Sequence, residues 1–137
     1  MPSVTGVLET ALYVEDLPRA IKFYQNLFHF EILFSDARAG AMSVANKQVL
    51  LLFKKGASLK PHQAWGGTIP PHDGAGNLHL AFSIAAAEFE NWENWLKQNG
   101  VKIESKVKWQ EGGQSLYFRD PDNHAIELAT PGTWAIY

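Results

Sequence analysis

The sequence contains no cysteine, few charged residues and no long apolar run. Without cysteine the chain can form no disulfide and no thiolate metal site, and it has no cysteine nucleophile. No apolar run approaches the roughly 18 residues that a membrane-spanning helix needs. The start, MPSVTGVLET, lacks the basic and apolar regions of a signal peptide. A net charge of −2 argues against a nucleic-acid or anionic-membrane partner, so we expect a cytoplasmic protein.

Apolar and aromatic side chains are plentiful by contrast. Hydrophobic residues make up 46% of the 137 residues, and the chain holds 5 Trp, 8 Phe and 4 Tyr. Such a composition can bury a core and can also line a cavity. The length fits one domain, or two small halves that share a core.

The chain repeats one pattern of predicted elements. Residues 7–14 (VLETALYV) and 77–84 (NLHLAFSI) alternate as half-buried strands do, and Glu9 and His79 are 79 − 9 = 70 residues apart. A predicted helix follows each strand, the first capped by Asp16. Three strand-like runs then follow each helix: FEILFS, GAMSVA and QVLLLFK in the first half, and VKIESKVKW, QSLYFRD and HAIELAT in the second.

This pattern predicts an α+β fold of two βαβββ modules within one domain, residues 1–137. We expect module one at about 5–54, module two at about 77–130 and a tail at 131–137. Residues 55–76, rich in glycine and proline, are expected to be a linker or lid without an element of its own. Turns are expected at Ala39-Gly40, Asn46-Lys47, Gly112-Gly113 and Asp122-Asn123. The alternative is an ordinary α+β domain whose repeat is accidental.

Strand alternation also separates the two faces of each sheet. One helix covers one face of each sheet, where the large aliphatic residues must lie. Glu9, His79 and Glu127 are left on the helix-free face, each beside an alanine that leaves room for a ligand. Matching the final turns of the two halves puts Leu51 where Glu127 stands. Three of four equivalent inward positions can therefore bind a metal.

The start ALYVEDLPRAIKFY, the segment LYFRDPDNHAIEL and the repeat resemble the vicinal oxygen chelate superfamily. This group includes glyoxalase I, bleomycin-resistance proteins, fosfomycin-resistance thiol transferases and extradiol dioxygenases. The resemblance covers roughly residues 7–130 and implies one incompletely closed mixed β-barrel around a cleft, with the helices outside. It implies a divalent metal held by Glu9, His79 and Glu127. Leu51 departs from the four-ligand glyoxalase I pattern, and Glu9 departs from the usual extradiol histidine.

One nitrogen and two carboxylate ligands suit Mn, Fe(II), Zn, Ni or Co, and three ligands leave open positions for a substrate. The expected function is therefore a metal-dependent enzyme acting on a small oxygenated substrate, as a lyase, isomerase, transferase or dioxygenase. Glu9 or Glu127 could serve as a base in such a reaction. The alternative is a metal-free pocket that sequesters a small molecule, in which Glu9 and His79 pair directly.

More specific roles are expected for several other residues. Tyr13, Leu51 and Phe53 share the inward face and are candidates for the substrate pocket. His72 is a candidate proton donor or acceptor, because it lies on a loop seven residues before His79. We expect the RDPD turn to be structural. The neighbouring His124 is expected at the surface. The apolar tail GTWAIY could pair two copies of the chain, which makes a homodimer a further expectation.

Overall fold

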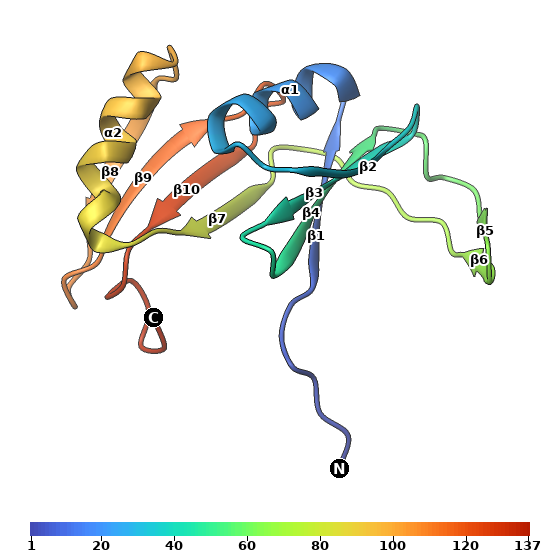
Figure 1. Ribbon diagram of the computed structural model, residues 1–137, viewed down its shortest axis with the longest axis horizontal. Coiled ribbons are helices and arrows are strands. Elements are labelled where there is room, and N and C mark those ends of the chain that lie inside the picture. The colour runs from blue at the N-terminus through green and yellow to red at the C-terminus, as the bar shows by residue number, and fades with distance from the viewer. The chain divides into compact units, whose positions relative to one another are not determined.

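The computed structural model describes residues 1–137, which form two compact units, residues 1–76 and 77–137. Each unit contains one α-helix and one four-stranded mixed sheet (Figure 1). The predicted α+β fold with two βαβββ modules is confirmed. The strands pair within two separate four-stranded sheets, and the single barrel stays a prediction.

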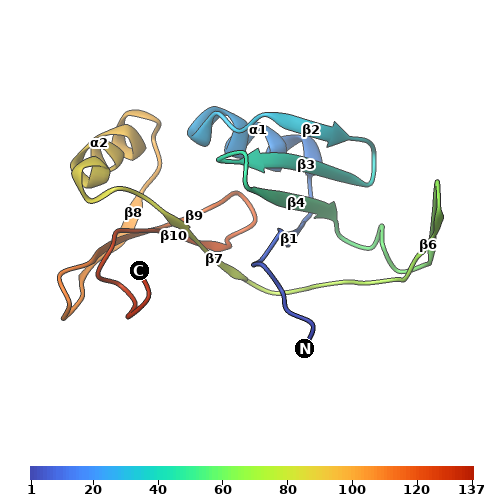
Figure 2. The same ribbon diagram turned by 60° about the horizontal axis from the view of Figure 1, so that its bottom comes forward.

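The first unit has the strand order β1-β4-β3-β2. Strand β1 is parallel to β4, and the other pairs are antiparallel. Helix α1 packs against β3 and β4 on one face of this sheet (Figure 2). The element bounds are β1 Glu9–Val14, α1 Leu17–Phe28, β2 Ile32–Ser35, β3 Ala39–Val44 and β4 Gln48–Lys54.

The second unit repeats this arrangement, with the strand order β7-β10-β9-β8. Strand β7 is parallel to β10, and the remaining pairs are antiparallel. A short 3₁₀ turn, Ala86–Glu88, leads into helix α2. The element bounds are β7 His79–Ser83, α2 Phe89–Gln98, β8 Ile103–Lys108, β9 Gln114–Arg119 and β10 Ala125–Ala129.

Local sequence explains where α1 begins and where α2 ends. The Asp16 carboxylate accepts a hydrogen bond from the Arg19 backbone N–H at 3.0 Å, and Pro18 sits in the first turn. This arrangement satisfies one of the N–H groups that a helix start leaves unpaired. Helix α2 ends before Gly100, whose φ of +69° is a left-handed conformation that glycine adopts without a steric penalty. These boundaries agree with the predicted ones.

The strand registers relate the two units residue by residue. Glu9 pairs with Val49 as His79 pairs with Ala125. Two residues further along, the pairs are Ala11 with Leu51 and Ala81 with Glu127. Leu51 therefore occupies the position in the first sheet that Glu127 occupies in the second, as the sequence predicted.

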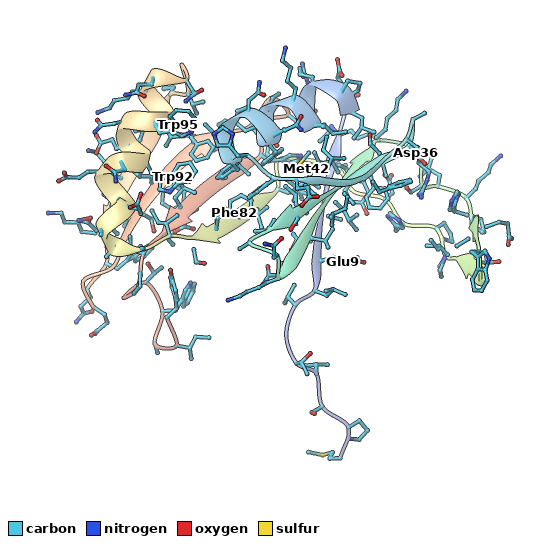
Figure 3. The ribbon with its side chains drawn as sticks, in the orientation of Figure 1. Glu9, Asp36, Met42, Phe82, Trp92 and Trp95 are labelled. Atoms are coloured by element: carbon cyan, nitrogen blue, oxygen red, sulfur yellow. The ribbon has the colours of Figure 1, made fainter.

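The expected turn at Ala39-Gly40 is wrong, because both residues belong to β3. The turn lies at residues 36–38, where the Asp36 carboxylate accepts from the backbone N–H groups of Arg38 at 2.7 Å and Ala39 at 2.8 Å (Figure 3). Gly40 is needed for packing instead. A Cβ there would come within 2.7 Å of Ile21 on α1. The other three expected turns are present, with left-handed residues at Asn46, Gly112 and Asn123.

The segment 55–76 was expected to hold no element, and this expectation is also wrong. It contains a hairpin of two three-residue strands, β5 His62–Ala64 and β6 Gly67–Ile69, which extends away from the first sheet (Figure 1). Trp65-Gly66 forms its tip. The strands are too short for a periodic pattern to stand out from the surrounding glycines and prolines. No helix of the protein is long and apolar enough to cross a membrane.

Candidate metal centre

His79 and Glu127 meet on the second sheet. His79 is the first residue of β7, and Glu127 stands in the middle of the adjacent strand β10. The His79 Nε2 atom lies 3.2 Å from Glu127 Oε2. The glutamate side chain is only 8% exposed, whereas the histidine side chain is 54% exposed. The pair thus joins a buried carboxylate to an imidazole that solvent or a ligand can reach.

A backbone hydrogen bond fixes which nitrogen of His79 faces the glutamate. His79 Nδ1 lies 2.9 Å from the carbonyl oxygen of Ala125. A carbonyl can only accept, so Nδ1 carries the hydrogen and donates it. In a neutral His79, Nε2 therefore presents its lone pair to Glu127 Oε2. Two lone pairs at this distance repel unless a proton or a metal ion lies between them.

Two further side chains hold Glu127 from the other side. Ser115 Oγ donates to Glu127 Oε1 at 2.5 Å, and Trp109 Nε1 donates to Ser115 Oγ at 2.8 Å. Ser115 is fully buried. One carboxylate oxygen is thus occupied by a hydrogen-bonded chain, which leaves Oε2 to face His79. Such outer partners orient a metal ligand.

Tyr117 lies beside the same pair. It stands opposite Glu127 in the pairing of β9 with β10, and its ring stacks on that of His79 with centroids 6.2 Å apart. Burial, together with hydrogen bonding to Glu127 and the charge of Glu127, raises the pKa of the Tyr117 phenol. Tyr117 therefore keeps its proton at neutral pH. Sequence reasoning missed Ser115 and Tyr117, whose signal was their place on the strand next to Glu127, and Trp109, which directly follows β8.

The third predicted ligand, Glu9, belongs to the first unit. It is the first residue of β1, as His79 is of β7, and its side chain is exposed (Figure 3). Neither unit alone brings together three or more His, Asp or Glu side chains that could hold a metal ion.

The other predicted residues of the first unit lie close to one another. Tyr13 Oη is 2.7 Å from His72 Nδ1, and the Phe53 ring stacks on Tyr13 and meets His72 edge-on. The loop carrying His72 can cross Tyr13 because residue 74 is glycine, where a Cβ would overlap the tyrosine ring. Leu51 is half-buried on the neighbouring strand β4.

His124 was expected at the surface, and this is wrong. Its side chain is buried, and its Nδ1 accepts from the backbone N–H of Leu78 at 2.9 Å. The turn explains the error, since Asp120 Oδ1 accepts from the backbone N–H of both Asp122 and His124 and redirects the chain inward. The structural interpretation of the RDPD turn agrees with these bonds and with the Arg119–Glu104 ion pair.

Comparison with known proteins places this geometry in a family. The family model described as the glyoxalase/bleomycin resistance protein/dioxygenase superfamily matches residues 6–128. A metallothiol transferase FosB of Staphylococcus epidermidis is 30% identical over 129 residues, covering 93% of this chain and 82% of that protein. The fosfomycin resistance protein FosX of Listeria monocytogenes is 27% identical over 132 residues, covering 91% of this chain and 89% of that protein.

Solved structures agree with the family match. The crystal structure of a lactoylglutathione lyase from Agrobacterium tumefaciens superposes with a TM-score of 0.88 at 28% identity, over 98% of this chain and 99% of that chain. A FosX variant from Listeria monocytogenes, solved with Mn(II) and dihydroxypropylphosphonic acid, gives a TM-score of 0.67 at 26% identity, over 92% and 90% of the two chains. The chain therefore belongs to the glyoxalase/bleomycin resistance protein/dioxygenase superfamily, also known as the vicinal oxygen chelate superfamily.

Proposed function

We propose that the chain is a divalent-metal-dependent enzyme acting on a small oxygenated substrate. The observation that carries the proposal is the approach of His79 Nε2 to Glu127 Oε2 at 3.2 Å, with Nδ1 already committed to a carbonyl. Two ligand atoms this far apart can both lie about 2.1 Å from one cation. The cation would also offset the charge of a carboxylate that is buried in the second sheet.

Glu9 is the proposed third ligand. Its support is its place in the first sheet, which is equivalent to that of His79 in the second. In this proposal the two sheets form one incompletely closed barrel around a cleft and direct all three side chains inward. Nitrogen and oxygen ligands without sulfur suit Mn, Fe(II), Zn, Ni or Co. The metal, when bound, supplies a Lewis acid that polarises the oxygens of the substrate.

The remaining roles are assigned by how firmly each side chain is held in place. Ser115 holds Glu127 in one position, whereas Glu9 is exposed at a strand end. Glu9 is therefore better placed than Glu127 to take a proton from the substrate or from an attacking nucleophile. His72 is proposed to transfer a second proton. Tyr13, Leu51 and Phe53 are proposed to line the substrate pocket.

The relatives narrow the reaction type. FosB is named a metallothiol transferase, and FosX a fosfomycin resistance protein. We therefore favour addition of a thiol or of water to an electrophilic carbon over ring-cleaving dioxygenation. Glu9 argues in the same direction, because it stands where extradiol enzymes usually have histidine, whereas Leu51 argues only against the four-ligand glyoxalase I pattern.

The test is an assay of the purified protein, stripped of metal and reloaded separately with Mn(II), Fe(II), Co(II), Ni(II) or Zn(II). Fosfomycin is supplied with water alone, with cysteine or with glutathione, and loss of the epoxide is followed by ³¹P NMR. A parallel reaction uses the hemithioacetal of methylglyoxal and glutathione. We expect turnover in at least one reaction, and only with metal present.

The controls separate this enzyme from a binding protein. Glu127→Gln keeps the size of the side chain but removes its charge, and it should lose metal and turnover together. Glu104→Gln removes an exposed carboxylate from the same unit and should change neither. Tight binding of a small molecule by the metal-free protein, with no turnover under any condition, would contradict the proposal in favour of sequestration.

We also infer that the chain forms a homodimer. The support is the exposure of large apolar side chains in the C-terminal segment, with Trp134 73% exposed and Ile136 98% exposed. Light scattering at micromolar concentration should give twice the 15.3 kDa mass of the chain. A monomeric mass would contradict the inference. Trp134→Ser is expected to shift the equilibrium toward the monomer.

A further inference from the structure

Arg38 holds a positive charge that acts on the nearby Asp36 carboxylate without forming a direct ion pair with it. It is half-buried directly before β3, with its guanidinium 5.6 Å from the centre of the Phe53 ring. It makes no ion pair, and its buried Nε atom has no hydrogen-bond partner. Buried polar groups are paired in most proteins, so an unpaired one calls for an explanation. A ligand that arrives with its own acceptor atoms is one such explanation.

Ser58 and His72 stand next to Arg38. The buried Ser58 hydroxyl lies 3.5 Å from Arg38 Nη1, and the Ser58 carbonyl accepts from the His72 backbone N–H at 2.9 Å. The Phe53 ring contacts both the guanidinium and the imidazole. Three polar side chains from separate segments are thus gathered around one aromatic ring.

The hydrogen-bond directions leave donors, rather than acceptors, available. Burial and the charge of Asp73 raise the pKa of the Tyr13 phenol, so its hydroxyl stays protonated and is hydrogen-bonded to His72 Nδ1. With Tyr13 as the donor of this bond, His72 Nε2 is left to donate to a ligand. Ser58 Oγ accepts from Arg38, so its hydrogen is available to donate. The nearest acid on the β2–β3 turn, Asp36, already accepts from two backbone N–H groups.

From this arrangement we propose that Arg38, Ser58 and His72 form a binding site for a carboxylate or phosphonate group. A guanidinium with two neutral donors beside it suits an oxyanion, because charge-assisted hydrogen bonds are about twice as strong as neutral ones. Asp73 and Asp36 lie nearby and favour a ligand of modest charge over a polyanion. This inference deepens the proposed function by assigning the acidic end of its substrate.

The site also indicates the orientation of that substrate. Tyr13 and Phe53 pair at one end of the β1–β4 ladder, and Glu9 stands four residues earlier on the same face of β1. Four residues of extended strand span about 13 Å. The substrate class is therefore an acid with chelating oxygens at the Glu9 end and an anionic group at the Arg38 end.

The test follows the arginine side chains by NMR. The chain has only three arginines, Arg19, Arg38 and Arg119, so their Nε–H signals can be assigned individually. Metal-free protein in EDTA is titrated with methylphosphonate and, separately, with propionate. We expect the Arg38 signal to shift and saturate at millimolar concentrations with at least one probe, while Arg19 and Arg119 stay in place. The tighter of the two probes identifies the class of acid.

Matched variants decide the outcome. Arg38→Lys keeps the charge but loses the fork of donors, and it should weaken binding at least tenfold, whereas Arg19→Lys should not. Ser58→Ala should weaken binding severalfold, and it keeps the test open if the Arg38 variant does not fold. No shift at Arg38 up to about 50 mM probe, or equal shifts at all three arginines, would overturn the site.

A second measurement separates this site from the proposed metal centre. If the protein binds Mn(II), relaxation of the ³¹P nucleus of bound methylphosphonate should place phosphorus outside the coordination sphere of the metal. Phosphorus at about 3 Å, within the coordination sphere, would overturn a separate anion site. Failure to bind Mn(II) at all would count against the proposed function alone, because the titration in EDTA does not depend on metal.

Discussion

The two units share one fold but differ at the positions that face inward. The second sheet places His79 and Glu127 within 3.2 Å of each other, with Ser115 and Trp109 behind the glutamate. At the equivalent positions the first sheet has Glu9, which is exposed, and Leu51, which cannot bind a metal. The same backbone therefore supports a ligand pair in one unit and a lone carboxylate in the other.

The first sheet uses its other end instead. At that end the Phe53 ring contacts Tyr13, His72 and the guanidinium of Arg38. In the proposals above, a few positions of one repeated framework assign metal chemistry to the second sheet and recognition of the substrate to the first. Substitutions at these positions test that division.

Among substitutions that leave the metal in place, the largest kinetic effect is expected at His72. His72→Ala should lower turnover by about 10²-fold, because it removes a proposed general acid or base, while the metal content stays unchanged. His62→Ala, which removes an exposed histidine of the same unit, is the control and should have no effect. Unchanged turnover in His72→Ala would contradict a role as general acid or base. The hydrogen bond to Tyr13 would then be the role left to His72.

A smaller effect, on metal affinity, is expected when a hydrogen-bond partner of Glu127 is removed. Ser115→Ala removes the donor to Glu127 Oε1 and should weaken metal binding by roughly 10- to 100-fold, as the loss of outer partners typically does. Competition with a fluorescent chelator measures this affinity. Ser105→Ala, on the exposed part of β8, should leave it unaltered. Equal affinities in the two variants would show that Ser115 does not position Glu127.

The smallest effect tests the equivalence of the two units directly. Leu51→Glu gives the first sheet the carboxylate that the second sheet has at Glu127. Without metal, this half-buried charge should lower the free energy of unfolding by about 1–3 kcal/mol. Urea unfolding with and without Mn(II) measures the change, and the metal should restore part of the loss. Leu33→Glu, on an exposed strand, should show no metal-dependent recovery.

Much of this comparison could be predicted from the sequence, because strand alternation and helix caps are local signals. They located both modules, placed Glu9, His79 and Glu127 by face, and aligned Leu51 with Glu127. The β5–β6 hairpin was missed because three-residue strands give no period. Gly40 was misjudged because glycine marks close packing as well as turns, and only the contact with Ile21 distinguishes the two.

The parts of the site that the sequence did not predict depend on contacts across strands. Ser115 and Tyr117 reach Glu127 through the β9–β10 register, which no local pattern encodes. His124 turns inward because Asp120 binds two backbone N–H groups, and an alternation rule cannot anticipate such a turn. Arg38 gave no signal either, since its buried Nε atom without a hydrogen-bond partner is a property of the folded chain.

Metal analysis of His79→Ala beside the wild-type protein tests the central claim most directly. Both proteins are loaded with Mn(II), passed through a desalting column and analysed for metal by mass spectrometry, with circular dichroism as the check on folding. We predict about one ion per chain in the wild type and almost none in the folded variant, because two carboxylates without an imidazole make a weak site. Equal metal content in the two folded proteins would contradict the assignment.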